Sequence, residues 1–150
     1  MKSIWILALF FIILTAESQN THINVQNNLG AAGYDLVSYS DNKAAKGSDK
    51  FTDTYEGIVY RFSSNVNLIK FKKDPSKYLP QYGGWCAYAM ATKGEKVKVN
   101  PKTFEVRDGK LYLFYDAYFN NTYEDWVNED PEELRKKADM NWLEILNKSS

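Results

Sequence analysis

The sequence predicts a single small α+β domain in which two antiparallel β-hairpins pack with short central helices and C-terminal helices. Two runs rich in aromatic and β-branched residues each surround a turn pair, at Glu56-Gly57 and at Asp108-Gly109. The segments with a helical pattern stand in blocks after the strands. The regular alternation of strand and helix that builds a parallel sheet is therefore missing, and the α+β class is favoured.

The first residues have the layout of a secretory signal peptide. Lys2 gives a short positive start, and Ile4 to Leu14 form an unbroken apolar run. Ala16 and Ser18 fit the small-residue rule for cleavage before Gln19. The apolar run is shorter than the ~20 residues that a helix needs to cross a bilayer, so removal is favoured over retention as a membrane anchor.

The signal peptide sets the expected organisation of the chain. Residues 1–18 are expected to be the signal, residues 19–32 a flexible lead-in, and residues 33–146 the folded domain. The domain is then secreted or periplasmic, with no stable membrane span after cleavage. The 19 basic and 19 acidic residues of the chain balance, whereas a nucleic-acid-binding protein carries a basic excess, so nucleic acid is not an expected partner.

The first half of the domain is expected to hold an extended segment, a polar loop and the first hairpin. Tyrosines and apolar residues from Gly33 to Ser40 predict a short strand or extended segment that enters the core. The polar run from Asp41 to Asp49 predicts a loop. The hairpin arms follow at Lys50 to Tyr55 and at Ile58 to Phe62, because both are rich in strand-forming residues.

A short amphipathic helix is expected after the first hairpin. Ser63 or Ser64 supplies its N-cap, and Asp74-Pro75 ends it, since the residue before a proline is disfavoured in a helix. The apolar face of this helix is expected to consist of Val66, Ile69 and Phe71, with Leu68 at its margin.

Two glycines and an alanine-rich run predict a short buried helix in the middle of the chain. Gly83-Gly84 interrupts the chain, and the helix from Trp85 to Thr92 ends before Gly94. The second hairpin follows, with its turn at Asp108-Gly109. Its apolar residues are expected to be Phe104 and Val106 on one arm and Leu111, Leu113 and Tyr115 on the other.

The last third of the chain has a helical pattern. One helix is expected from Asp116 to about Glu129. A second begins at Pro131, because Asp130 can cap it, proline suits the first helical position, and acidic residues occupy the first turn. We expect the two hairpins to form an antiparallel sheet that packs against these helices.

Six phrases of the sequence occur in an order that is characteristic of one family. They are "GYDLVSYS", "KAAKGSDKFT", "YEGIVYRFSS", "FKKDPSKYLPQYGGWCAYAMATK", "DGKLYLFYD" and "KADMNWLEI". Together they cover roughly Gly33 to Ile145, nearly all of the chain that follows the signal. On these phrases the chain resembles the exported proteins built around a YHS domain.

The resemblance implies a small binding or accessory domain. YHS domains are similar to modules in copper-transporting ATPases and in some oxygenase subunits, for which metal binding is commonly proposed. Those versions carry additional cysteines in the hairpin and helix region, where this sequence has Phe62-Ser63-Ser64. Some exported relatives are described as selenoproteins, which favours redox chemistry if their selenocysteine aligns with Cys86.

Cys86 is the only cysteine of the chain, and three roles are open to it. On a helix Cys86 and Met90 share a face, and a thiolate with a thioether suits Cu(I), to which Asp35 could add an oxygen. A redox thiol is the alternative, because the first turn of a helix that starts at Trp85 would stabilise a thiolate. The third role is core packing, which is common for buried Cys and Met.

Aromatic residues around the two glycines suggest a binding region of another kind. The expected ligand region consists of Tyr34, Asp35, Tyr82, Gly83, Gly84 and Trp85, and further tyrosines that could join it are Tyr39, Tyr60, Tyr78 and Tyr88. The alternative is that these rings only close the core of a small domain. The chain lacks the Gly-x-Ser-x-Gly and His-Glu-x-x-His motifs of hydrolases, so a non-enzymatic domain is favoured.

Overall fold

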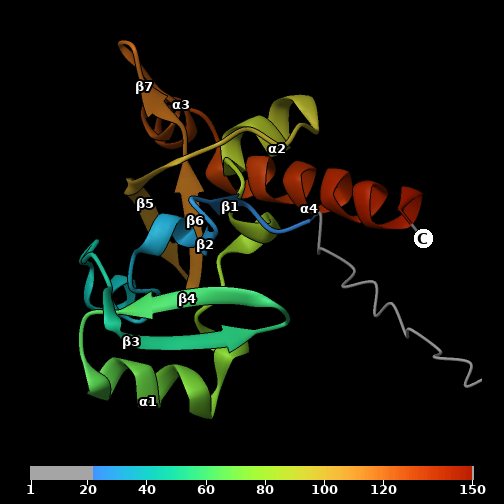
Figure 1. Cartoon of the computed structure of the whole chain (residues 1–150). Coiled ribbons are helices and arrows are strands. Elements are labelled where there is room, and N and C mark those ends of the chain that lie inside the picture. Colours follow the sequence, from blue (N-terminus) through green and yellow to red (C-terminus); the bar gives the residue numbers. More distant parts are fainter. Residues whose placement is uncertain (1–21, 150) are drawn as a thin grey trace, which may run out of the picture.

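Four antiparallel hairpins and four α-helices make up the part of the chain that this computed structural model describes, residues 22–149 (Figure 1). The strand pairs are β1 (Val25–Gln26) with β2 (Leu29–Gly30), β3 (Ser48–Tyr55) with β4 (Ile58–Phe62), β5 (Asn100–Arg107) with β6 (Lys110–Phe114), and β7 (Asp116–Ala117) with β8 (Asn120–Asn121). The α-helices are α1 (Asn65–Lys73), α2 (Ala87–Lys93), α3 (Thr122–Asn128) and α4 (Pro131–Lys148). The 3₁₀ helices are η1 (Ala31–Gly33), η2 (Ser38–Asp41), η3 (Pro75–Lys77) and η4 (Gln81–Gly84). These elements form one α+β domain, as the sequence predicts.

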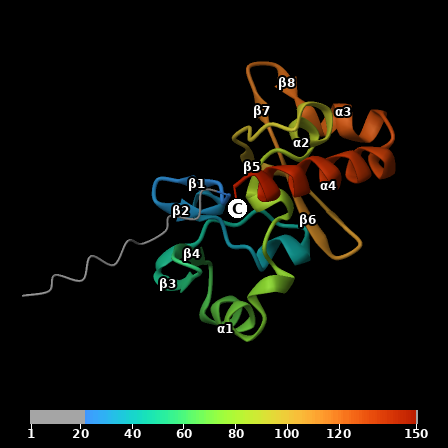
Figure 2. The ribbon, with the colours of Figure 1, turned by 90° about the vertical axis from the view of Figure 1, so that its right-hand side faces the viewer.

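Strand β6 divides the interior into two hydrophobic cores. Leu111 and Leu113 belong to the first core, and Tyr112 and Phe114 belong to the second. Successive side chains of a strand point to opposite faces, so a strand that is buried on both faces serves both cores. Figures 1 and 2 show the β3–β4 hairpin and α1 at one end of β6, and α2, α3 and α4 at the other.

The first core is a cluster of aromatic rings between the β3–β4 hairpin and α1. Phe71 of α1 is fully buried and meets four rings, those of Tyr55, Tyr60, Phe62 and Tyr78, at centroid distances of 6.1, 5.4, 4.9 and 6.5 Å. Aromatic pairs at such distances add to the stabilisation that burial of apolar area provides. Phe71 therefore fixes α1 to the hairpin.

The second core joins the three later helices to β6. Trp126 of α3 is fully buried, and its ring lies 5.4 Å from that of Phe114 and 5.8 Å from that of Tyr112. Small and apolar residues of α2 and α4 complete this core, namely Ala87, Met90, Ala91, Leu134 and Ala138. The alanine-rich α2 can therefore lie close to α4, which is its main helical neighbour.

The free edge of β6 is covered by the chain between the two cores. Pro80 forms a parallel bridge with Leu111, and Cys86 forms a parallel bridge with Leu113. Because β5 occupies the other edge, both sides of β6 have backbone neighbours. The segment between Pro80 and Cys86, which contains η4, is thereby held against the centre of the domain.

The local signals of the sequence are confirmed at both hairpins and at the helix caps. The hairpin turns lie at Glu56-Gly57 and Asp108-Gly109, as predicted. The Ser64 hydroxyl accepts a hydrogen bond of 3.2 Å from the backbone N–H of Asn67, which begins α1. Asp130 caps α4 by accepting hydrogen bonds from two backbone N–H groups. The central helix ends at Gly94 as predicted, although it begins at Ala87, two residues later than expected.

The expectation of one sheet built from both hairpins is wrong. Each of the four strand pairs stays a separate two-stranded sheet within the described residues. The free edge of β6 is occupied by Pro80 and Cys86, so it is not available to the first hairpin. The two hairpins meet through side chains of the first core, not through backbone hydrogen bonds.

The segment from Gly33 to Ser40 is not the extended strand that its composition predicted. After a bridge between Tyr34 and Lys46, the chain turns into η2. The Asp35 carboxylate accepts hydrogen bonds from the backbone N–H groups of Val37 and Ser38, which bends the chain at this point. Asp side chains commonly form such local turns in competition with extended structure.

The helix expected from Asp116 begins only at Thr122. The preceding residues form the short β7–β8 hairpin, whose tip carries the exposed, left-handed residues Tyr118 and Phe119. The backbone N–H and the hydroxyl of Thr122 both donate to the carbonyl of Tyr115, which closes the hairpin. Asn121 then caps α3. The closure of this hairpin therefore overrides the helical pattern before Thr122.

The buried face of α1 also differs from the prediction. Val66 and Ile69 are 61% and 58% exposed, whereas Phe71 is buried and Leu68 packs against the first core. Each residue turns the helix by about 100°, so Val66 lies about 160° from Leu68, and Ile69 lies about 160° from Phe71. The helix meets only one hairpin, and a single narrow stripe is enough to cover that contact.

Residues 22–32 are packed against the domain and are not the loose lead-in that their Asn and Gly content suggested. Asn24 is 3% exposed, and the β1–β2 hairpin lies beside β4. The folded domain therefore includes this segment. The predicted signal peptide, residues 1–18, lies outside the described residues. Within residues 22–149 no helix is both long enough and apolar enough to span a bilayer.

The different burial of two α1 residues gives a test of this packing. Phe71→Ala should lower the free energy of unfolding by about 3–5 kcal/mol, because it empties the centre of the first core. Ile69→Ala, on the same helix, should change it by about 0.5 kcal/mol or less. Urea unfolding of both variants measures the difference. Similar losses for the two variants would contradict this placement of α1.

Candidate functional site

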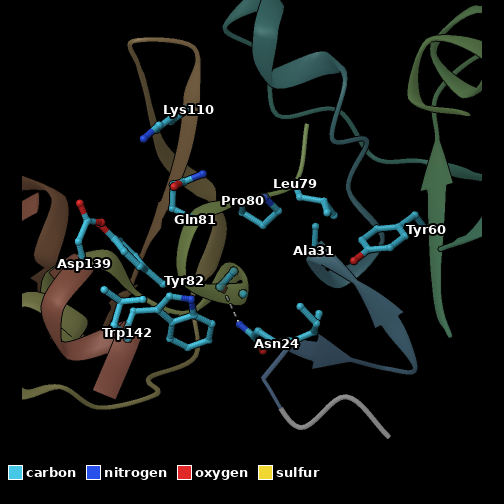
Figure 3. A pocket seen from close by; sticks show the side chains of 14 residues that line it. Asn24, Ala31, Tyr60, Leu79, Pro80, Gln81, Tyr82, Lys110, Asp139 and Trp142 are labelled. Carbon is cyan, nitrogen blue, oxygen red and sulfur yellow. Dashed lines mark hydrogen bonds between the residues drawn. The ribbon is translucent and has the colours of Figure 1, made fainter. Parts of the chain in front are cut away.

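A cavity of about 530 Å³ lies between α4, η4, the N-terminal segment and the β4 strand (Figure 3). Figure 3 shows Tyr82 and Trp142 on one side of it, Leu79, Ala31 and Tyr60 on the other, and Asn24 between them. The remaining lining residues are Ile23, Pro80, Gln81, Gly83, Gly84, Lys110, Asp139 and Leu143. The volume falls in the range of about 300–1,000 Å³ that is typical of small-molecule sites.

The wall at η4 depends on the two glycines that stand out in the sequence. Tyr82, Gly83 and Gly84 have consecutive positive φ angles of 55°, 62° and 80°. A Cβ atom on Gly83 would overlap the carbonyl oxygen of His22, because the N-terminal segment crosses the turn there. Glycine at 83 therefore allows both the left-handed turn and the close approach of the segment.

Asn24 ties the N-terminal segment to this turn. Its backbone N–H donates to the carbonyl of Gly83 at 2.8 Å, and its side-chain Nδ2 donates to the carbonyl of Gly84 at 2.9 Å. These bonds fix the orientation of the amide. The other side-chain atom, Oδ1, is buried and has no hydrogen-bond partner among the described residues.

Tyr60 brings a second polar group to the cavity. The residue is 3% exposed, and its ring lies over Gly30, where any Cβ atom would overlap it. Figure 3 shows the hydroxyl end of Tyr60 directed toward the cavity beside Ala31. This hydroxyl makes no hydrogen bond with any residue of the range 22–149. Burial raises the pKa of Tyr60 to about 12, so the hydroxyl is protonated at neutral pH.

The charged residues of the cavity are at its rim. Asp139 and Lys110 line it but are themselves exposed. The Tyr82 hydroxyl donates to Asp139 Oδ1 at 2.9 Å. Burial, and after it this hydrogen bond, raise the pKa of Tyr82 far above its usual value, so Tyr82 also stays neutral. The cavity thus has a mainly aromatic and apolar lining with neutral polar groups from Asn24, Tyr60, Gln81 and Tyr82, and its charged residues are exposed.

The expected ligand region is divided by the structure. Tyr82, Gly83 and Gly84 line the cavity, together with Tyr60 from the wider set of tyrosines. Trp85 lies beside the turn, where its indole N–H donates to the carbonyl of His22 at 2.9 Å. The remaining residue pair, Tyr34 and Asp35, does not line this cavity; Tyr34 belongs to the first core.

The Asp35 carboxylate is the centre of a buried hydrogen-bond network. It is fully buried, and its carboxylate accepts five hydrogen bonds. Oδ1 binds the N–H groups of Val37 and Ser38, and Oδ2 binds the N–H and hydroxyl of Ser63 and the amide of Asn67. Both oxygens are therefore occupied, and the carboxylate joins η2 to the start of α1.

Neither Cys86 nor Met90 lines this cavity, and Cys86 lines a separate, smaller pocket of about 270 Å³ together with Tyr115 and Thr122. Cys86 is the N-cap of α2 and not a residue of its first turn, and both side chains are fully buried. The Cys86 Sγ atom lies 3.3 Å from the Thr122 hydroxyl and accepts a hydrogen bond of 3.4 Å from the N–H of Tyr115. Met90 packs in the second core. Residues 22–149 hold no group of three His, Cys, Asp or Glu side chains that could bind a metal ion.

The sequence did not point to three of the residues that shape the cavity most. Asn24 lies in a segment without a recognisable motif, and Leu79 and Trp142, although they fall within two of the six phrases, look like ordinary apolar positions. One usable signal was Asn27-Asn28, a pair that suits a tight hairpin turn and has positive φ angles here. It would have predicted an ordered hairpin next to Asn24.

Comparison with known proteins gives no information on the function of this site. No protein-family model, no curated protein and no solved structure matches the chain. The resemblance to YHS-domain proteins therefore stays an expectation from the sequence.

The five hydrogen bonds of Asp35 give a prediction for stability. Asp35→Asn should lower the free energy of unfolding by about 3 kcal/mol or more, because an amide NH₂ would face donors that now have a charged acceptor. Asp41→Asn is the control, since Asp41 is exposed, and it should cost about 0.5 kcal/mol or less. Urea unfolding at neutral pH compares the two. Equal stabilities would mean that the Asp35 network contributes little.

The burial of Cys86 predicts a protected thiol. Iodoacetamide should modify Cys86 at least ~100-fold more slowly in the native protein than in concentrated urea. The reagent reaches the buried thiol only when the protein unfolds locally or globally. Mass spectrometry follows the reaction. Rapid alkylation of the native protein would favour the redox role, and saturable Cu(I) binding that Met90→Leu removes would favour the metal role. Both roles stay predictions until these measurements are made.

Proposed function

We propose that the chain is an exported, non-enzymatic binding domain of the YHS type that holds a small organic molecule in the cavity beside Tyr82, Gly83 and Gly84. The observation that carries this proposal is the cavity itself, which combines aromatic walls with a buried side-chain carbonyl oxygen of Asn24 that has no partner among the described residues and with the Tyr60 hydroxyl directed toward it. Small-molecule sites are commonly built in this way, with a mostly apolar lining and a few placed polar groups. Export rests on the predicted signal peptide, residues 1–18.

The lining chemistry favours binding over catalysis. The cavity is lined by no Cys, Ser, Thr or His side chain among the described residues, so the usual nucleophiles and the usual general base are missing from it. Its two tyrosines stay protonated because their pKa values are raised. Its one carboxylate, Asp139, is exposed and already accepts the Tyr82 hydroxyl. These groups can hold and orient a ligand.

The position of the cavity suits an accessory role. Its walls come from β4 of the first core, from α4 of the second core and from the N-terminal segment. A bound molecule would therefore contact all three parts and hold them together. Ligand binding should in that case also stabilise the fold, because a ligand that binds only the folded state shifts the unfolding equilibrium.

Nuclear magnetic resonance titration with 2-naphthol and with 2-methoxynaphthalene tests the proposal. At least one of these flat probes should give saturable shifts of the Gly83 and Gly84 amides and of the Trp142 indole, and should raise the melting temperature. Trp142→Ala should weaken binding about tenfold, because it removes an aromatic wall. The matched control is Met140→Ala on the same helix, an exposed residue that does not line the cavity, which should leave binding unchanged.

The proposal fails if neither probe shifts these resonances. It also fails if Met140→Ala and Trp142→Ala weaken binding equally, because the probe would then bind the surface of α4 and not the cavity.

A further inference from the structure

The side chains of Asn24 and Tyr60 restrict the class of ligand that the cavity can bind. Asn24 and Tyr60 are each 3% exposed, so each is more than nine-tenths buried. Buried polar atoms in proteins nearly always have a hydrogen-bond partner, and an orphan costs free energy comparable to a lost hydrogen bond. Asn24 Oδ1 is such an orphan, and the Tyr60 hydroxyl, which is directed toward the cavity, makes no hydrogen bond with any residue of the range 22–149. Partners for both groups would therefore come from outside the chain.

Asn24 Oδ1 and the Tyr60 hydroxyl determine which hydrogen-bonding atoms a ligand needs. Asn24 Nδ2 is engaged with the carbonyl of Gly84, so the free atom is Oδ1, which can only accept. The Tyr60 hydroxyl is protonated at neutral pH and can donate or accept. A hydroxyl group on the ligand meets both needs, because it donates one hydrogen bond and accepts others.

The walls set the shape and the charge of the ligand. Tyr82 and Trp142, whose ring centroids are 6.4 Å apart, form an edge-to-face pair on one side, and Leu79 and Ala31 lie on the other. A planar ring of a ligand packs favourably against such aromatic side chains. No charged side chain lines the interior, since Asp139 and Lys110 are exposed, and an unpaired charge is costly to bury.

We infer that the cavity takes an uncharged, flat ring compound that carries a hydroxyl group and buries this hydroxyl against Asn24 and Tyr60. The inference rests on the proposed binding function and adds the ligand class to it. The ring lies against Tyr82 and Trp142, and the exposed Leu143 and Asp139 leave the mouth open for substituents.

A matched pair of probes tests the role of the hydroxyl. 2-Naphthol and its methyl ether, 2-methoxynaphthalene, share the same ring system, but the ether cannot donate a hydrogen bond. Wild-type protein should bind 2-naphthol at least about tenfold more tightly, because a buried acceptor discriminates against a ligand that leaves it unpaired. Calorimetric or fluorescence titration gives both dissociation constants.

A pair of tyrosine variants separates a ligand contact from a structural one. Tyr60→Phe removes a hydroxyl that has no partner within residues 22–149, so it should leave the urea midpoint unchanged or raise it. The variant should weaken the binding of 2-naphthol about fivefold and leave the affinity for 2-methoxynaphthalene unchanged. The control is Tyr39→Phe, because the Tyr39 hydroxyl donates to the carbonyl of Pro101 at 2.7 Å. That variant should lower the urea midpoint and leave both affinities unchanged.

The outcomes distinguish this inference from the proposed function. Equal binding of the two probes in the cavity overturns the hydroxyl requirement and leaves the binding function in place; Asn24 Oδ1 and the Tyr60 hydroxyl then bind only water. Preference for 2-naphthol that persists in Tyr60→Phe overturns the assignment of Tyr60. Absence of binding by either probe overturns the proposed function as well.

Discussion

The burial of β6 on both faces is the constraint on which the rest of the structure depends. Its five residues supply Leu111 and Leu113 to one core and Tyr112 and Phe114 to the other. Both of its edges also have backbone neighbours, with β5 on one side and Pro80 and Cys86 on the other. Neither core can form around β6 without the other, because the same strand is one wall of each. Two clusters of side chains therefore behave as one domain, and the η4 turn is held at the boundary between them.

The cavity is a consequence of that boundary. The η4 turn lies where the two cores separate, and its glycines leave room for the N-terminal segment to cross it. Asn24 then closes the base through two hydrogen bonds to Gly83 and Gly84. A side chain at position 83 would push the N-terminal segment away, and the cavity would lose its floor. The segment that composition alone marked as a lead-in is thus part of the site.

The buried polar groups of the domain fall into two classes with different meanings. Both carboxylate oxygens of Asp35 are engaged, by five donors in all, and the carboxylate joins η2 to the start of α1. Asn24 Oδ1 is also buried but has no such donor, and the Tyr60 hydroxyl, which is directed toward the cavity, has no hydrogen-bond partner among the described residues either. A satisfied buried network specifies structure, whereas an unsatisfied one indicates a partner from outside. This contrast separates the structural carboxylate from the binding groups, which their residue types alone could not do.

The sequence by itself determined the features that depend on residues close together in the chain. The turns at Glu56-Gly57 and Asp108-Gly109 and the caps at Ser64 and Asp130 were predictable, because turn and cap chemistry acts over a few residues. Only the tertiary structure decided which side of α1 is buried, where α3 begins and which residues line the cavity. The start of α3 depends on the closure of the β7–β8 hairpin by Thr122. The cavity depends on pairs far apart in the sequence: Asn24 with Gly84, and Tyr60 across the cavity from Trp142. Such pairs leave no local pattern, because their energy arises only after the two cores have assembled on β6.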